Sequence, residues 1–319
     1  MAANDRFGWL ARWRQWLTGS EWPSVACEVA VDAVTAVRGA RGGHRIEAWA
    51  TRPLANGAVR PGPLIENVAE GETLTRSLRE VLEEAAGREK GVALILPDAV
   101  ARSWLLSIEN LPEKPPEALA LLRWRLAKEV AFDLEQAVVA YQIFSGRPSG
   151  KAVLVVAVLR SILRQYELCL EAAGYQPGWV TLATLATLGW MKPDSATNEL
   201  LVRRDSESLG LAIVRGNDLR FVRCIPATLA DGSADALFEQ IYPSLVYFQD
   251  TWGEPVRNAL LVGVGDATAA LARLLAQEAG CQAAPLELGS LLPDAAGGSP
   301  VQARNLVAPL GFMRAGSES

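Results

Sequence analysis

A strand–helix–strand–strand pattern between residues 92 and 159 constrains the fold of this chain more than any other feature. Apolar, β-prone runs surround one segment whose leucines recur at helical spacing, and Pro115 and Pro116 stand where that helix can begin. The predicted elements are strands at Val92–Leu96, Val100–Ile108, Val138–Phe144 and Ala152–Leu159, and a helix at Glu117–Val130. The last strand is an unbroken apolar run, which is typical of a strand buried on both faces. Since a further helix follows from Ser161 to Ala173, a compact unit is set inside a longer α/β chain.

The rest of the sequence repeats one plan twice. Each half opens with a predicted strand hairpin, within 25–52 and within 199–225, and then adds helices and a further strand. The predicted helices are Leu74–Ala86 in the first half, then Leu237–Phe248 and Ala269–Ala279 in the second. The segment 191–194 is the clearest linker. This repetition predicts a duplicated α/β fold.

Composition excludes several classes of function. The chain has 319 residues, is 50% hydrophobic and carries a net charge of −5, so a nucleic-acid surface is not expected. Its four cysteines form no CxxC pair, which argues against a zinc site, and its single histidine, His44, lies in a predicted turn. No Ser/His/Asp or Cys/His catalytic set can be assembled. We expect the scattered cysteines to be reduced and structural, as in a cytoplasmic protein. No apolar run is long enough to span a membrane, and no signal peptide is recognisable.

Residues 5–19 precede the first predicted strand and have a different character. Trp9, Trp13 and Trp16 recur at helical spacing among three arginines, as in an amphipathic helix that lies at a membrane interface. The alternatives are a helix docked on the chain's own fold and a disordered tail. Peripheral contact with a membrane is therefore one of three open interpretations of this extension.

Three segments carry a resemblance to a known family. They are LILPDAVARSWLLSIENLPEKPPEALALLRWRLAKEVAFDLEQAVVAYQIF, LVVAVLRSILRQYELCLEAAGYQP and LAIVRGNDLRFVRCIPA. In order and spacing they resemble the FtsA and PilM branch of the actin-like ATPase superfamily, and the PilM family of type IV pilus platform proteins best.

This resemblance implies a duplicated actin-like (ribonuclease H-like) α/β fold with an inserted SHS2-type subdomain. The implied divisions are an extension at 1–22, a first half at 23–194 with the insert at about 99–174, and a second half at 195–319. The segment at about 303–313 is expected to return to the first half.

The resemblance also implies a function. PilM-like proteins are cytoplasmic scaffolds, peripheral to the inner membrane, in which the N-terminal peptide of a PilN-like membrane protein lies between the first half and the insert. Here the helix Pro116–Val130 is predicted to place polar residues and a tryptophan at that groove: Arg123, Trp124, Arg125 and Lys128. The competing interpretation of Trp124 is a core residue. Other platform proteins are expected partners, and the oligomeric state stays open.

The nucleotide motifs of the family are degenerate in this chain. Where relatives read D-I-G-S-S-S-V-K, this chain has Glu28 to Thr35; where they read V-D-I-G, it has Val202 to Asp205; and S-G-G-G-A is replaced by Val262 to Asp266. Side chains stand where glycine lets the backbone approach phosphate, and an arginine replaces the metal-directed aspartate. The degenerate site comprises Glu28, Ala30, Asp32, Arg203, Asp205, Ser206, Gly263 and Gly265. We therefore predict no ATP hydrolysis, no cofactor and no metal.

Two alternatives remain. In a rewired nucleotide site, Arg203 and Arg204 would meet phosphate while Glu28 or Asp32 held Mg²⁺, as in an active actin-like ATPase. The other alternative is the cytoplasmic part of a GspL-like protein of a type II secretion platform.

Overall fold

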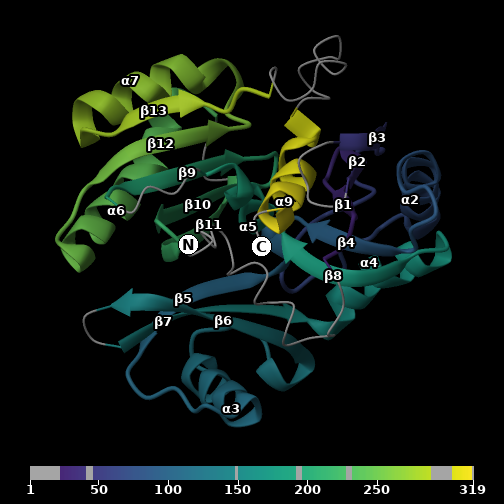
Figure 1. The fold of residues 1–319 in the computed structure, drawn as a ribbon, viewed down its shortest axis with the longest axis horizontal. Coiled ribbons are helices and arrows are strands. Elements are labelled where there is room, and N and C mark those ends of the chain that lie inside the picture. Colours follow the sequence, from purple (N-terminus) through teal and green to yellow (C-terminus); the bar gives the residue numbers. More distant parts are fainter. Residues whose placement is uncertain are drawn as a thin grey trace, which may run out of the picture.

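The computed structural model describes residues 22–40, 46–147, 150–191, 196–227, 232–288 and 304–317. They form two five-stranded mixed sheets and one three-stranded antiparallel sheet (Figure 1). The predicted duplicated α/β fold with a small inserted sheet is confirmed. His44 and the tryptophans Trp9, Trp13 and Trp16 lie outside the described residues.

The first half is built on a sheet of strand order β3-β2-β1-β4-β8. Its strands are β1 (Val25–Val29), β2 (Ala33–Gly39), β3 (Ile46–Pro53), β4 (Gly91–Leu96) and β8 (Gln176–Leu182). The first three pair antiparallel, whereas β4 is parallel to both β1 and β8. Because β4 is a central strand and covered on both faces, residues 92–96 are all buried and all apolar.

Helices cover this sheet (Figure 1). They are α2 (Gly71–Ala85), α4 (Arg160–Ala172), α5 (Ala183–Thr187) and α9 (Val307–Ser317). The helices α2 and α4 pack side by side, while α9 lies against β1, β2 and α5. A Cβ atom on Gly189 would overlap the carbonyl oxygen of Gly311, so two glycines let α9 cross the first half at backbone contact. The segment near the C-terminus thus packs on the first half.

The second half repeats the plan with strand order β11-β10-β9-β12-β13. Its strands are β9 (Asn198–Arg204), β10 (Ser208–Arg215), β11 (Asp218–Pro226), β12 (Val256–Val262) and β13 (Gln282–Pro285). The helices α6 (Ala234–Trp252) and α7 (Thr268–Ala279) pack on each other and cover the sheet. The sequence did not predict β13, which is short and mostly exposed. Helix α6 continues through Pro243 and ends at Gly253, whose φ is 68°.

The insert contains the third sheet, of order β5-β7-β6, and one helix. Its elements are β5 (Arg102–Ile108), α3 (Pro115–Leu126), β6 (Ala137–Arg147) and β7 (Gly150–Leu159). One face of β7, with Val153 and Val155, packs beneath α3, while the opposite face, with Leu154 and Val156, joins the core of the first half. This double burial explains the unbroken apolar run that the sequence showed.

The predicted insert, about 99–174, extends too far. It included α4, whose buried residues Ile162, Tyr166 and Leu170 belong to the core of the first half. Helix α4 packs mainly against α2 and β8 and makes fewer contacts with β7 of the small sheet. The structure therefore ends the insert with β7, at Leu159.

Candidate functional site

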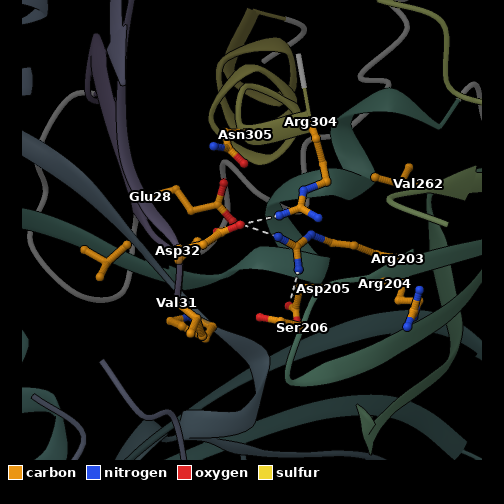
Figure 2. Close-up of a pocket in the computed structure, with 13 residues that line it drawn as sticks. Glu28, Val31, Asp32, Arg203, Arg204, Asp205, Ser206, Val262, Arg304 and Asn305 are labelled. Atoms are coloured by element: carbon orange, nitrogen blue, oxygen red, sulfur yellow. Dashed lines mark hydrogen bonds and ion pairs between the residues drawn. The ribbon is translucent and has the colours of Figure 1, made fainter. Parts of the chain in front are cut away.

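The carboxyl ends of β1 and β9 meet across a cleft between the two halves. Six of the predicted nucleotide-site residues line one small cavity there, together with Arg304 and Asn305, which precede α9 (Figure 2). The six are Glu28, Ala30, Asp32, Arg203, Asp205 and Ser206. The cavity measures about 30 Å³, which holds no more than a few water molecules. The other two predicted residues, Gly263 and Gly265, follow Val262, which also lines this cavity.

An ion cluster made by Arg203 fills the cleft. Its Nη2 donates to Oε1 of Glu28 in the first half at 2.7 Å, and its Nη1 donates to Oδ2 of Asp205 at 2.8 Å. Asp98, in the 3₁₀ helix η1 (Asp98–Val100) after β4, lies 3.6 Å from the same Nη1 atom. The side chains of Arg203 and Glu28 are only 11% and 5% exposed. We call these four residues the Arg203 cluster; it joins the two halves through buried charges.

Further hydrogen bonds fix the carboxylates of the Arg203 cluster. Asp205 accepts hydrogen bonds from the backbone N–H groups of Glu207 and Ser208, at 2.9 and 2.6 Å. Asp98 accepts from both the backbone N–H and the hydroxyl of Thr184, the latter at 2.7 Å. Because Asp98 and Asp205 are each held by hydrogen bonds within their own half, Arg203 meets two preorganised acceptors.

Burial sets the protonation of the Arg203 cluster. It raises the pKa of Glu28 to about 7, an effect that Arg203 partly offsets and that Asp205, Asp98 and Asp32 increase. Burial likewise raises the pKa of Asp98, against the opposing effect of Arg203. Burial alone would lower the pKa of Arg203, but the carboxylates Glu28, Asp205 and Asp98 raise it overall. The arginine thus stays charged, while Glu28 and Asp98 hold protons more strongly than exposed carboxylates do.

A second cation closes the mouth of the cleft. Arg304 donates to Oδ2 of Asp32 at 2.6 Å, and their side chains are 39% and 47% exposed (Figure 2). The alternative of a rewired nucleotide site assigned Mg²⁺ to Glu28 or Asp32. Each of these carboxylates is instead paired with an arginine of this chain.

The residues present do not fit ATP and Mg²⁺. Ligand pockets of this kind measure about 300–1,000 Å³, an order of magnitude above the cavity here. Arg203 is committed to three carboxylates, and a phosphate beside it would face those carboxylates as well. Within the described residues, no group of three or more His, Cys, Asp or Glu side chains is arranged to hold a metal ion.

Gly263 has a structural reason to be glycine that does not involve a ligand. Its φ is 72°, and a Cβ atom there would overlap the carbonyl oxygen of Arg204 on the neighbouring strand. A glycine is thus required for the turn after β12 to pass the end of β9.

A second concave feature lies between the first half and the insert. This apolar groove, of about 240 Å³, is lined by β8, by η1 and by the face of the insert sheet that looks away from α3. Its lining residues are Leu96, Val100, Ala101, Val138, Ala140, Val156, Val158, Leu163, Leu185 and residues 177–182. Thr181 supplies a hydroxyl group and Trp179 an indole, and no charged side chain lines the described groove.

The predicted contact residues on α3 do not lie at the apolar groove. Helix α3 covers the opposite face of the insert sheet, so placing Arg123, Trp124, Arg125 and Lys128 at the groove was wrong. The alternative for Trp124, a core residue, is also wrong, because 75% of Trp124 is exposed. Arg123 instead donates to the carbonyl oxygens of Leu134 and Ala137. An apolar stripe shows that a helix packs on a sheet but not which face it covers.

Sequence reasoning missed three residues of the cleft: Asp98, Thr184 and Arg304. A signal for Asp98 was present, because it directly follows a buried strand parallel to β1, and carboxyl ends of parallel strands meet at one sheet edge. Thr184 and Arg304 carry no comparable signal, since only the packing of α5 and the chain path before α9 bring them to the cleft.

Comparison with known proteins shows which solved structures have a similar fold. No family model matches the chain, and no curated protein matches it in sequence. A chain of the solved PilM-PilN type IV pilus biogenesis complex matches its structure with a TM-score of 0.72 at 19% identity, covering 92% of this chain and 97% of that chain. The chain therefore shares the fold of that chain, with two α/β halves and a small inserted sheet.

Two other solved structures are similar at lower scores. The cytoplasmic domain of EpsL, an inner-membrane component of the type II secretion system of Vibrio cholerae, gives a TM-score of 0.47 at 13% identity, over 75% of this chain and 81% of that chain. A Bacteroides thetaiotaomicron protein with an actin-like ATPase fold gives 0.48 at 12% identity, over 84% and 92%. In the described part of this chain, no helix has the length and apolar character needed to cross a bilayer.

Proposed function

We propose that this chain is a non-catalytic, PilM-like scaffold that binds the cytoplasmic N-terminal peptide of a PilN-like membrane protein. One observation carries the proposal. A chain with the PilM fold presents an open apolar groove between its first half and its insert, while its nucleotide cleft is filled by its own side chains. Apolar grooves of this kind suit extended peptides, which bury alternate side chains.

The Arg203 cluster supports the non-catalytic part of this proposal. In this fold a nucleotide with its metal would lie between the halves, and here a guanidinium from the second half already meets carboxylates of the first. A chain that joins its halves through an internal cation needs no nucleotide to do so. ATP hydrolysis would require Arg203 to leave three carboxylates, two of them almost fully buried.

Attachment to a platform explains where such a scaffold would act. Binding to the cytoplasmic segment of a membrane protein would hold the chain at the inner membrane from the cytoplasmic side. Other pilus or secretion platform proteins are then expected on surfaces that the groove leaves exposed.

Peptide binding to matched variants tests the proposal. Ala140→Trp fills the apolar groove, and Ala120→Trp places the same side chain on the exposed surface of α3, beyond the opposite face of the insert sheet. With a synthetic peptide of the PilN-like protein's cytoplasmic N-terminus, we expect Ala140→Trp to weaken binding by about tenfold or more and Ala120→Trp by less than about twofold.

Thermal unfolding of the three proteins serves as the control for folding. Equal affinity of the wild type and Ala140→Trp would place the peptide elsewhere. Loss of binding in Ala120→Trp alone would move the site to α3, where the sequence had first suggested it.

A further inference from the structure

Trp22, the first residue that the structure describes, fixes the point at which the N-terminal extension meets the fold. Its ring stacks on that of Phe312 in α9, with centroids 4.5 Å apart, and lies 5.2 Å from the ring of Trp179 in β8. A Cβ atom on Gly316 would overlap the ring of Trp22, so this ring is closely packed against α9. Because Trp179 also lines the apolar groove, residues 1–21 are joined to the fold beside that groove.

The sequence of the extension is complementary to the apolar groove. On a helix with about 100° per residue, five of its apolar side chains fall within about 120° of one another. They are Trp9, Leu10, Trp13, Trp16 and Leu17, which we call the extension stripe. The described groove has no charged side chain, so it can bury this stripe without leaving a charge unpaired. Arg12 and Arg14 fall on either side of the stripe, where their guanidinium groups can stay in water.

The connection to Trp22 is short enough to keep the extension stripe at the groove. The five residue steps from Leu17 to Trp22 span at most about 18 Å. A segment on such a short tether has an effective concentration in the millimolar range. A weak affinity for the groove is therefore enough for the extension to occupy it, and a free peptide must compete with that concentration.

We propose that the N-terminal extension of this chain binds in its own apolar groove through the extension stripe and controls access to it. Of the three interpretations that the sequence left open, this selects a helix docked on the chain's own fold. The docking itself depends only on the extension and the groove. Its consequence, competition with the partner peptide, rests on the function proposed above.

Limited digestion of full-length variants with trypsin tests the docking without any partner. Trypsin cleaves after Arg12 and Arg14 only where the surrounding chain opens locally. Ala140→Trp fills the groove, so these two sites should be cleaved about tenfold or more faster than in the wild type. Ala120→Trp carries the same side chain on α3 and should be cleaved at the wild-type rate. Mass spectrometry of the shortened chains measures the rates.

A substitution in the extension makes the test independent of any change to the groove. Trp13→Ser removes the central side chain of the extension stripe and should speed cleavage by a similar factor, whether or not Ala140→Trp folds. Equal rates in the wild type and Trp13→Ser would overturn the docking. Sedimentation with phosphatidylglycerol vesicles tests the membrane interpretation, because a docked extension is not free to bind them. Strong and equal vesicle binding by the wild type and Ala140→Trp would also overturn the docking.

The PilN-like peptide separates the two proposals. If the extension competes for the groove, Trp13→Ser should bind this peptide about tenfold more tightly than the wild type. Peptide binding without any difference in cleavage would leave the scaffold function standing and the docking wrong. Faster cleavage of Trp13→Ser, with no peptide binding by any of the chains, would leave the docking standing and contradict the proposed function.

Discussion

At the scale of single residues, the Arg203 cluster sets one guanidinium among three carboxylates in a largely buried site. Removing charges from water costs several kcal/mol per ion, and only close pairing with further hydrogen bonds compensates for it. Each carboxylate here has such support, from Arg203 directly and, for Asp98, from Thr184. Losing the cation should therefore cost far more than losing an exposed pair.

A pair of matched substitutions tests that comparison. Arg203→Met leaves Glu28 and Asp98 buried without their cation, so we expect the free energy of unfolding to fall by about 3–5 kcal/mol. Arg304→Met removes an arginine that also pairs with a carboxylate of the first half, but at the exposed mouth, and should cost about 0–1 kcal/mol. Urea unfolding measures both, and losses of equal size would contradict a buried role for Arg203.

Glu28 gives the cluster a pH dependence of defined sign. Its pKa is raised from 4.5 to about 7, so between these values the folded chain keeps a proton that the unfolded chain has released. The free energy of unfolding should therefore decrease as pH rises from about 4.5 to 7. Unfolding of the wild type and Glu28→Gln across this range tests it, because the substitution should flatten the curve. A wild-type curve that rises through this window would show that the sign is wrong.

At the scale of secondary-structure elements, α3 shows what its charged residues do. Arg123 joins the helix to the carbonyl oxygens of Leu134 and of Ala137, the first residue of β6, whereas Arg125 and Lys128, the latter just beyond the end of α3, are exposed. The helix is thus held to the insert by one arginine and by buried residues such as Leu122 and Leu126.

Alanine substitutions along α3 should separate these roles. Arg123→Ala leaves two carbonyl oxygens without their charged donor, and we expect a loss of stability of about 1–3 kcal/mol. Arg125→Ala and Lys128→Ala should change stability by no more than about 0.5 kcal/mol. Thermal unfolding with calorimetric enthalpies provides the measurement. An equal loss in all three variants would mean that the helix is held by its net charge rather than by these bonds.

The elements that the sequence predicted best are those whose burial is visible in their own pattern of apolar residues. The runs in β4 and β7 are apolar because both faces are covered, and the stripe of α2 faces its own sheet, so pattern alone located them. Short β13 lacks such a pattern, because it is an exposed edge strand held by backbone pairing with β12. The face of the sheet that α3 covers and the packing partner of α4 depend on tertiary contacts. The spacing of apolar residues along a helix does not show these contacts.

At the scale of the whole molecule, the two halves meet through more than the Arg203 cluster. Gly210 on β10 lies so close to Thr184 of α5 that a Cβ atom there would overlap its hydroxyl oxygen. The same hydroxyl donates to Asp98, and residues beside both, Val100 and Leu185, line the apolar groove. The contact between the halves and the groove therefore share η1 and α5.

Gly210→Ala tests this packing between the halves. The added methyl group must displace Thr184 from Asp98, so we expect a loss of about 1–3 kcal/mol and weaker peptide binding. Thr184→Ala in the same background removes the overlapping hydroxyl and should recover part of the stability. Additive losses in the double variant would contradict contact between the two residues.

The sequence predicted which residues gather in the cleft but not what they do there. Six of them line one cavity, since they follow or precede strand ends that the duplicated plan brings together. That Arg203 points inward rather than to solvent depends on Asp98 and on the approach of the two sheets. Neither the position of Asp98 nor the approach of the two sheets can be inferred from the residues next to Arg203 in the sequence.

The most direct test of the central claim is a calorimetric titration of the full chain with the PilN-like peptide, without and with saturating Mg²⁺ and ATP. A scaffold whose cleft is closed by Arg203 should bind one peptide per chain with the same Kd, within about twofold, under both conditions. Mg²⁺ and ATP alone should not raise its Tm. A peptide affinity that changes tenfold with nucleotide, or the absence of saturable peptide binding, would contradict this account.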